Sequence, residues 1–180
     1  MRLLAHSTLL GLLLFVGSAP AVEMRDPYHH FFLDTFGNLD EELARARDEG
    51  KKGVLLFFEM DECPFCHWMK QNVLSREDLQ SFFRQNFNCY TVDIEGDLPM
   101  TDFEGNPTTQ KEFAQVANRV RATPVFAFYD LDGNRIVRFT GKTRDHLEFL
   151  WLGEFVVGGM YEQTNFTRYK RARREQVDAQ

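Results

Sequence analysis

Residues 53–72 read GVLLFFEMDECPFCHWMKQN, an apolar run followed by two cysteines with two residues between them. The run Gly53 to Glu59 has the length and composition of a buried β-strand. Cys63 to Asn72 is predicted to be a helix, because Pro64 falls in the first turn, where a missing N–H group costs nothing. The stretch therefore predicts a strand that leads into a cysteine pair at the start of a helix.

Hydrophobic periodicity and turn residues indicate the remaining elements. Helices are predicted at 38–48, 75–86, 109–120 and 143–157, strands at 87–94, 125–129 and 135–139, and a loop at 95–107. The first two strands are linked by helices and should be parallel, whereas the last two form a hairpin. This order predicts an α/β fold with a central mixed sheet of about four to five strands flanked by helices.

The first 21 residues have the pattern of a secretory signal peptide. Arg2 supplies a positive start, Leu9 to Val16 is almost wholly apolar, and Ala19-Pro20-Ala21 matches an A-x-A cleavage site. The apolar run is far shorter than the ~18 to 20 residues that a membrane anchor needs, so stable membrane insertion is not expected. We expect cleavage near the Ala21–Val22 bond and a periplasmic or secreted mature protein.

Length and composition fit one folded domain. The 180 residues are 43% hydrophobic and 27% charged, which is typical of a globular chain with a core. Residues 22–37 are predicted to be an irregular lead-in, residues 38–160 the domain, and residues 161–180 a basic, polar tail that is partly helical and weakly docked. The net charge of −6 argues against nucleic acid as a partner.

The spacing of Cys63 and Cys66 allows a small disulfide ring at the start of a helix. The thiolate is the reactive form of cysteine, and a helix N-terminus stabilises it. Cys63 is expected to be exposed just before the helix. Cys66, one turn in and more buried, could then attack a mixed disulfide formed on Cys63.

Two other interpretations of the pair remain open at this point. A C-x-x-C motif is also half of a zinc site, but neither Cys89 nor the histidines supply a second ligand pair of the expected spacing. An inert structural disulfide is the other alternative, and the placement of the pair between a strand and a helix favours the redox interpretation. We therefore expect no metal and no cofactor.

The chain resembles the thioredoxin superfamily over about residues 38–158. The resemblance rests on the strand that leads into Cys63-x-x-Cys66 and on Arg121-Ala122-Thr123-Pro124-Val125, followed by a hairpin and a closing helix. It implies a thioredoxin fold in which Pro124 is cis and packs against the cysteine pair. It also implies that Thr123 offers backbone hydrogen bonds to a substrate peptide. An ordinary proline at a strand start is the alternative for Pro124. Phe65 is expected to be exposed beside Cys63, where it could touch substrate.

The sequence departs from ordinary thioredoxins around the pair. The Pro-Phe dipeptide is closer to the Pro-Tyr of glutaredoxins than to Gly-Pro. Phe57 stands where the family often carries a buried acid, and Cys89 stands where many members have a lysine. Glu59, two residues after Phe57, is either a substitute proton acceptor or a strand-end charge in solvent. Cys89 is expected to be a small buried hydrophobe.

These features predict a thiol–disulfide oxidoreductase that reduces or exchanges protein disulfides in the periplasm. The partners would be proteins with cysteines or disulfides. A resemblance to exported thioredoxin-like proteins of sulfur oxidation and cytochrome c maturation implies a membrane thiol electron donor. Two alternatives are a non-catalytic binding or chaperone module and a glutaredoxin-like, glutathione-linked reductase.

Overall fold

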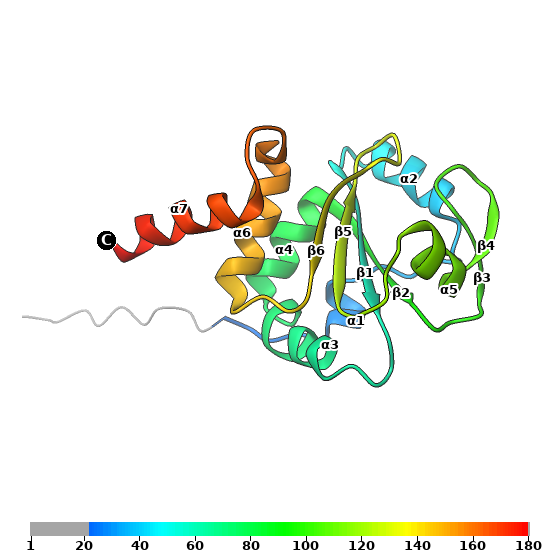
Figure 1. The fold of residues 1–180 in the computed structure, drawn as a ribbon, viewed down its shortest axis with the longest axis horizontal. Helices are drawn as coiled ribbons and strands as arrows, with labels where there is room; N and C mark the ends of the chain where they lie inside the picture. The colour runs from blue at the N-terminus through cyan, green and yellow to red at the C-terminus, as the bar shows by residue number, and fades with distance from the viewer. Residues whose placement is uncertain (1–21, 180) are drawn as a thin grey trace, which may run out of the picture.

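Strand β1 (Gly53–Glu59) lies at the centre of the computed structural model, which describes residues 22–179 (Figure 1). All seven of its residues are buried, as the apolar run predicts. A strand that is buried on both faces needs cover from two layers, and this need organises the rest of the fold. The predicted signal peptide lies outside the described residues.

The central sheet has four strands in the order β2-β1-β5-β6. Strand β2 (Phe87–Asp93) is parallel to β1, and β5 (Val125–Tyr129) is antiparallel to β1. Strand β6 (Arg135–Thr140) returns beside β5 as a hairpin. The predicted parallel pair, the predicted hairpin and the mixed α/β class are confirmed.

Helices cover the face of the sheet that carries Leu55 and Phe57. They are α3 (Pro64–Met69), the π-helical turn that continues it (Lys70–Leu74), α4 (Glu77–Asn86) and α6 (His146–Val157). Their buried apolar side chains form one core cluster, which also contains Cys63 and Cys66. In Figure 1, α4 and α6 lie together on one side of the sheet.

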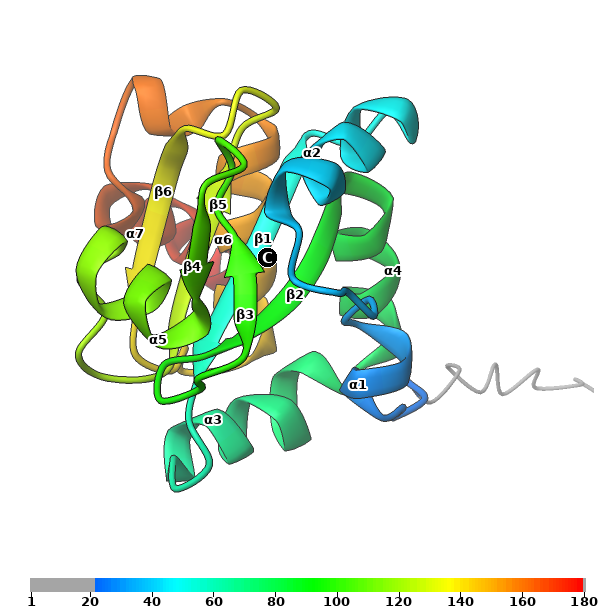
Figure 2. The same cartoon turned by 90° about the vertical axis from the view of Figure 1, so that its right-hand side faces the viewer.

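The opposite face is covered by α2 (Leu39–Asp48), α5 (Gln110–Glu112) and a small two-stranded sheet (Figure 2). That sheet pairs β3 (Pro99–Thr101) with β4 (Pro107–Thr109). The prediction of a loop over 95–107 was therefore incomplete. Gly, Pro and Asp are frequent there because they form the tight turn that joins two very short strands.

Two predicted helices have wrong boundaries, and local hydrogen bonds give the reason. After α5 a π-helical turn ends at Ala117, because the Asn118 side-chain amide donates to the Phe113 carbonyl and Arg119 takes a left-handed φ of 53° that breaks the helix. Val116 lies in this turn and is 75% exposed. Helix α6 begins at His146, not Thr143, because the Asp145 side chain caps it.

The lead-in is more regular than predicted. It contains a short helix, α1 (Pro27–His30), which the Asp26 side chain caps. Phe31 and Phe32 follow and are buried, 0% and 5% exposed, so these two aromatic residues pack on the domain, whereas Phe36 is exposed. The Leu33 N–H then donates to the Cys89 carbonyl at 2.8 Å, which ties the lead-in to the edge of β2.

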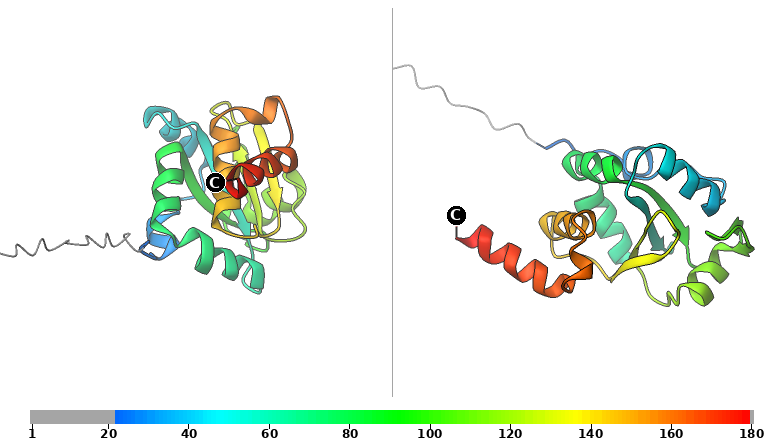
Figure 3. Two further views of the ribbon diagram at one scale, coloured as in Figure 1. Left: turned by 90° about the vertical axis from the view of Figure 1, so that its left-hand side faces the viewer. Right: turned by 90° about the horizontal axis from the view of Figure 1, so that it is seen from above.

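The tail is docked more firmly than predicted. Helix α7 (Phe166–Asp178) packs against α6, with its C-terminal end projecting from the body (Figure 3). Phe166 and Tyr169 contact the ring of Phe155, while Lys170 pairs with buried Glu148 at 2.6 Å. Neither α7 nor any other helix within residues 22–179 combines the length and apolar character needed to cross a membrane.

Replacing Lys170 with Met should destabilise the protein. Glu148 is 4% exposed, and Lys170 is its nearest cation; Arg174 is 3.9 Å away. A buried charge that loses a hydrogen-bond partner costs about 1–3 kcal/mol. Urea denaturation should show this loss, whereas Arg168→Met on the exposed side of the same helix should leave the midpoint within error. Equal midpoints for both variants would show that α7 is not held by this pair.

Candidate active site

Cys63 and Cys66 form a disulfide at the start of α3, and their Cα atoms are 5.2 Å apart. Cys63 is the N-cap residue, so its backbone is still extended while Cys66 lies in the first turn. The Cys66 N–H donates to the Cys63 sulfur at 3.0 Å, and Pro64 occupies the first helical position as predicted. A backbone N–H directed at this sulfur favours negative charge there when the bond is broken.

Both cysteines are buried in this oxidised form, which corrects the prediction that Cys63 is exposed. Cys63 is 2% and Cys66 1% exposed, and both belong to the core cluster that also contains Phe57 and Phe126. Phe65 between the two cysteines is 55% exposed, so this residue does lie at the surface as predicted.

The Thr123–Pro124 peptide bond is cis, as the resemblance implies. Pro124 precedes β5, whose first residue, Val125, pairs with Phe58 near the end of β1. The cis bond therefore lies at the end of the sheet from which the chain leads to Cys63. Among residues 22–179, the buried hydroxyl oxygen of Thr123 has no hydrogen-bond partner.

The loop after β6 contacts both the cis-proline segment and α3. The Gly141 N–H donates to the Pro124 carbonyl at 2.8 Å, and the Thr143 hydroxyl lies 3.6 Å from the sulfur of Met69 in α3. The Lys142 ammonium lies 4.1 Å from the ring centroid of Trp68, also in α3. This loop therefore holds the cis-proline segment and the redox helix in one arrangement.

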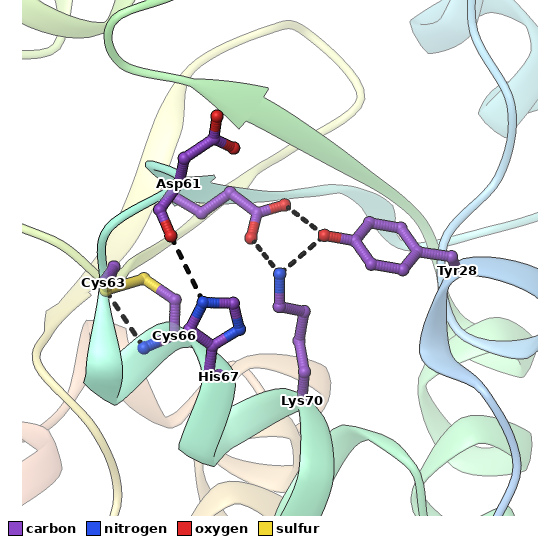
Figure 4. Close-up of a disulfide and its surroundings, with 7 residues drawn as sticks. Tyr28, Asp61, Cys63, Cys66, His67 and Lys70 are labelled. Atoms are coloured by element: carbon purple, nitrogen blue, oxygen red, sulfur yellow. Dashed lines mark hydrogen bonds and ion pairs between the residues drawn. A yellow bond between two sulfur atoms is a disulfide. The ribbon is translucent and has the colours of Figure 1, made fainter.

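Glu59 is not a strand-end charge in solvent, which excludes one of its two predicted roles. Its side chain is 12% exposed and pairs with the Lys70 ammonium at 2.6 Å (Figure 4). The Tyr28 hydroxyl donates to the same carboxylate at 3.2 Å and accepts from Lys70 at 2.6 Å. The other predicted role, proton acceptor, stays a prediction.

Burial and hydrogen bonding act in opposite directions on the two partners of Glu59. Desolvation lowers the pKa of Lys70, but its hydrogen bonds to Glu59 and Tyr28 outweigh this and the pKa is raised. For Tyr28 the directions are reversed: burial is the largest effect and raises the pKa of the hydroxyl, whereas the hydrogen bond with Lys70 lowers it. Lys70 is therefore a stable cation on the redox helix.

Sequence reasoning missed both Lys70 and Tyr28. Lys70 follows Cys66 by four residues, a spacing that puts the two on one face of a helix, so this signal was present. Nothing in the sequence marks Tyr28, because its contact joins segments that are 42 positions apart.

The apolar substitutions around the pair are where the sequence predicts them. Phe57 is fully buried and packs on Phe32 and Phe126, where the superfamily often has an acid. Cys89 is a free, buried cysteine, and desolvation strongly raises the pKa of its thiol. Within residues 22–179, no group of His, Cys, Asp and Glu is arranged to hold a metal ion.

A family model described as a thioredoxin-like domain matches residues 39–156. This match covers more than half of the chain, and the protein belongs to the thioredoxin-like family. Comparison with curated proteins gives no match.

Solved structures agree on the fold. A thioredoxin-fold protein from Helicobacter pylori is similar with a TM-score of 0.63 and 21% identity, over 84% of this chain and 95% of that one. A putative disulphide-isomerase from Bacteroides thetaiotaomicron is similar with a TM-score of 0.56 and 19% identity, over 77% and 97% of the two chains. A DsbH oxidoreductase is similar with a TM-score of 0.54 and 18% identity, over 78% and 95%. At these identities the likeness shows the thioredoxin fold.

Proposed function

We propose that this protein is a thiol–disulfide oxidoreductase that reduces or exchanges disulfides of other proteins through Cys63 and Cys66. The observation that carries the proposal is the Cys63–Cys66 disulfide at the start of α3, within a thioredoxin-like domain that has a cis Thr123–Pro124 bond. A pair that can bond reversibly at a helix N-terminus has the chemistry for thiol exchange.

The cycle needs no metal and no cofactor. The Cys63 thiolate attacks one sulfur of a substrate disulfide, a bond forms between them, and the second substrate sulfur leaves and takes up a proton. Cys66, once deprotonated, then attacks the Cys63 sulfur. The Cys63–Cys66 bond forms, the mixed disulfide breaks, and the substrate leaves as a dithiol. The substrate has gained two electrons and two protons, and the protein has lost them.

The surface beside the cysteine pair, formed by Phe65 and the cis-proline segment, suits a polypeptide substrate. Phe65 offers an exposed aromatic ring, and the backbone of Thr123, which precedes the cis proline, offers hydrogen bonds to a peptide. Both lie next to the cysteines, on α3 and on the cis-proline segment. We assign them to substrate binding, with Pro124 packed against the pair.

The site of action that we propose is the periplasm. The support is the N-terminal sequence, with its positive start, short apolar run and A-x-A cleavage pattern. Each turnover leaves the pair oxidised, so a thiol donor must return two electrons. A membrane protein with its own dithiol would supply them outside the cytoplasm. The DsbH oxidoreductase and the oxidised DsbD C-terminal domain from Neisseria meningitidis, both similar in fold, are in keeping with thiol–disulfide exchange and do not bear on the location.

The assay is insulin reduction with dithiothreitol as the electron source. The mature wild-type protein should accelerate precipitation of the insulin B chain, and Cys63→Ser should be no faster than the blank. Cys89→Ala is the matched control, because it also removes one thiol but leaves the pair intact. If wild type and Cys63→Ser were equally inactive, the binding-module alternative would replace the enzyme. Activity with glutathione as sole donor would instead favour the glutaredoxin-like alternative.

A further inference from the structure

Three polar side chains from three separate elements meet beside the redox helix (Figure 4). Glu59 ends β1, Lys70 begins the π-helical turn that continues α3, and Tyr28 lies in α1. Each makes a hydrogen bond with the other two, at 2.6, 2.6 and 3.2 Å. The side chains of Lys70 and Glu59 are only 13% and 12% exposed, so solvent screens this ion pair weakly.

The cluster lies on the side of α3 that carries Cys66. The Lys70 N–H donates to the Cys66 carbonyl, so helical geometry is kept between them. Residues four apart on a helix share a face, with about 5–6 Å between their Cβ atoms. Glu59 shares a strand face with Phe57, which packs in the same core cluster as both cysteines. The ammonium is therefore carried by the helix that starts at the cysteine pair, and the carboxylate by the strand that leads into it.

Other charged groups near the cluster are more open to solvent. A hollow of about 170 Å³ is lined by the three residues together with Met60, Asp61, His67 and Asp93. Asp61 and His67 are exposed, and the His67 ring lies 3.2 Å from the Asp61 carbonyl. Asp93 is half-buried at the end of β2. Among the groups that line this hollow, Glu59 and Lys70 are the charged pair most shielded from water.

Reduction changes the charge next to this pair. The disulfide is neutral, whereas the reduced pair must carry a thiolate in order to react. A lone Glu59 carboxylate would oppose that thiolate, because like charges repel in a poorly solvated site. The Lys70 ammonium compensates the carboxylate. The Tyr28 hydroxyl holds both groups in place, since it accepts a hydrogen bond from Lys70 and donates one to Glu59.

We propose that Lys70, held by Glu59 and Tyr28, is a positioning residue that makes thiolate formation at the cysteine pair easier. This inference rests on the proposed function. It also makes the N-terminal segment part of the redox site, because Tyr28 lies outside the matched domain of residues 39–156. A thioredoxin-like domain cut to the matched residues would lack one of the three groups.

The test is the pH dependence of alkylation of the reduced protein by iodoacetamide, with Cys89→Ala as the background. The alkylation rate reports the thiolate of the pair and needs no substrate protein. The midpoint of the pH–rate profile belongs to the dithiol as a unit. Lys70→Met should raise this midpoint by about one unit, which slows alkylation about tenfold below it. Glu59→Gln should shift the midpoint in the opposite direction.

Further variants separate this role from a structural one. Lys70→Arg should recover most of the wild-type profile, and Tyr28→Phe should shift the midpoint upward by less than Lys70→Met. The double variant Glu59→Gln/Lys70→Met leaves no unpaired charge and should return close to wild type. Lys111→Met removes an exposed lysine in α5 and should change nothing.

Coincident profiles for wild type, Lys70→Met and the double variant would overturn the inference. If Lys70→Met does not fold, Glu59→Gln is the deciding variant. The midpoint of its pH–rate profile must be lower than that of the wild type if the inference holds. Insulin reduction decides the proposed function separately. Shifted alkylation profiles without insulin reduction would support the electrostatic role of Lys70 and reject the proposed activity. Unshifted profiles with normal insulin reduction would support the activity and reject the electrostatic role.

Discussion

A Cys66→Ser variant should remain covalently joined to its substrates through Cys63. Cys66 lies one helical turn from Cys63, so its attack on a mixed disulfide is intramolecular and has a very high effective concentration. Without it, an external thiol must release the substrate, and we expect release to be slower by roughly three orders of magnitude or more. Non-reducing electrophoresis with reduced, mature Cys66→Ser and oxidised insulin should show the adduct.

The double variant Cys63→Ser/Cys66→Ser is the control, because it keeps Cys89 as its sole cysteine in the mature chain. It should give no adduct, since Cys89 lies inside β2 and not at a helix start, and desolvation strongly raises the pKa of its thiol. Mass spectrometry of the adduct should place the bond at Cys63. An adduct through Cys89, or no adduct from Cys66→Ser, would contradict the roles assigned to the two cysteines.

Phe149→Ala should cause the largest loss of stability among single substitutions considered for this fold. Phe149 in α6 is fully buried, and its ring centroid lies 4.5 Å from that of Phe83 and 4.8 Å from that of Phe126. Truncation leaves a cavity among rings that belong to α4 and β5. Phe-to-Ala changes in such cores cost about 3–5 kcal/mol.

Urea denaturation followed by circular dichroism should show this loss as a lower midpoint. Phe36→Ala is the matched control, because the same atoms are removed from a side chain that is 98% exposed. Its midpoint should stay close to that of the wild type. Similar midpoints for Phe149→Ala and Phe36→Ala would show that the α6 layer is not packed as described.

The central part of the fold could be predicted from the sequence because its signals are local. The apolar run of β1, Pro64 at the first helical position and the turn before β6 each depend on neighbouring residues. The cis bond at Pro124 is different, since only the family resemblance predicted it. Recognition of the thioredoxin superfamily is confirmed by the match over residues 39–156.

What the sequence could not predict depends on contacts between distant segments. Tyr28 reaches Glu59 across 31 positions, and no periodicity marks such a contact. The sequence alone is compatible with a solvent-exposed or a buried charge at Glu59, because its ion pair with Lys70 forms only in the folded chain. The burial of Cys63 has the same origin, because core packing of several elements decides it. Docking of α7 likewise depends on Glu148, which looks like an ordinary helix-surface acid in the sequence.

The central claim is that Cys63 and Cys66 form a reversible disulfide that a partner's thiol can reach. Alkylation of the purified, folded mature protein, followed by peptide mass spectrometry, tests it most directly. Before reduction, both residues should be unlabelled and the peptide that carries both should lack two hydrogens. After dithiothreitol, Cys63 should be labelled rapidly while Cys89 stays protected until the protein is unfolded. A Cys63 that resists both dithiothreitol and label in the folded protein, or a pair bound to a metal ion, would contradict the account.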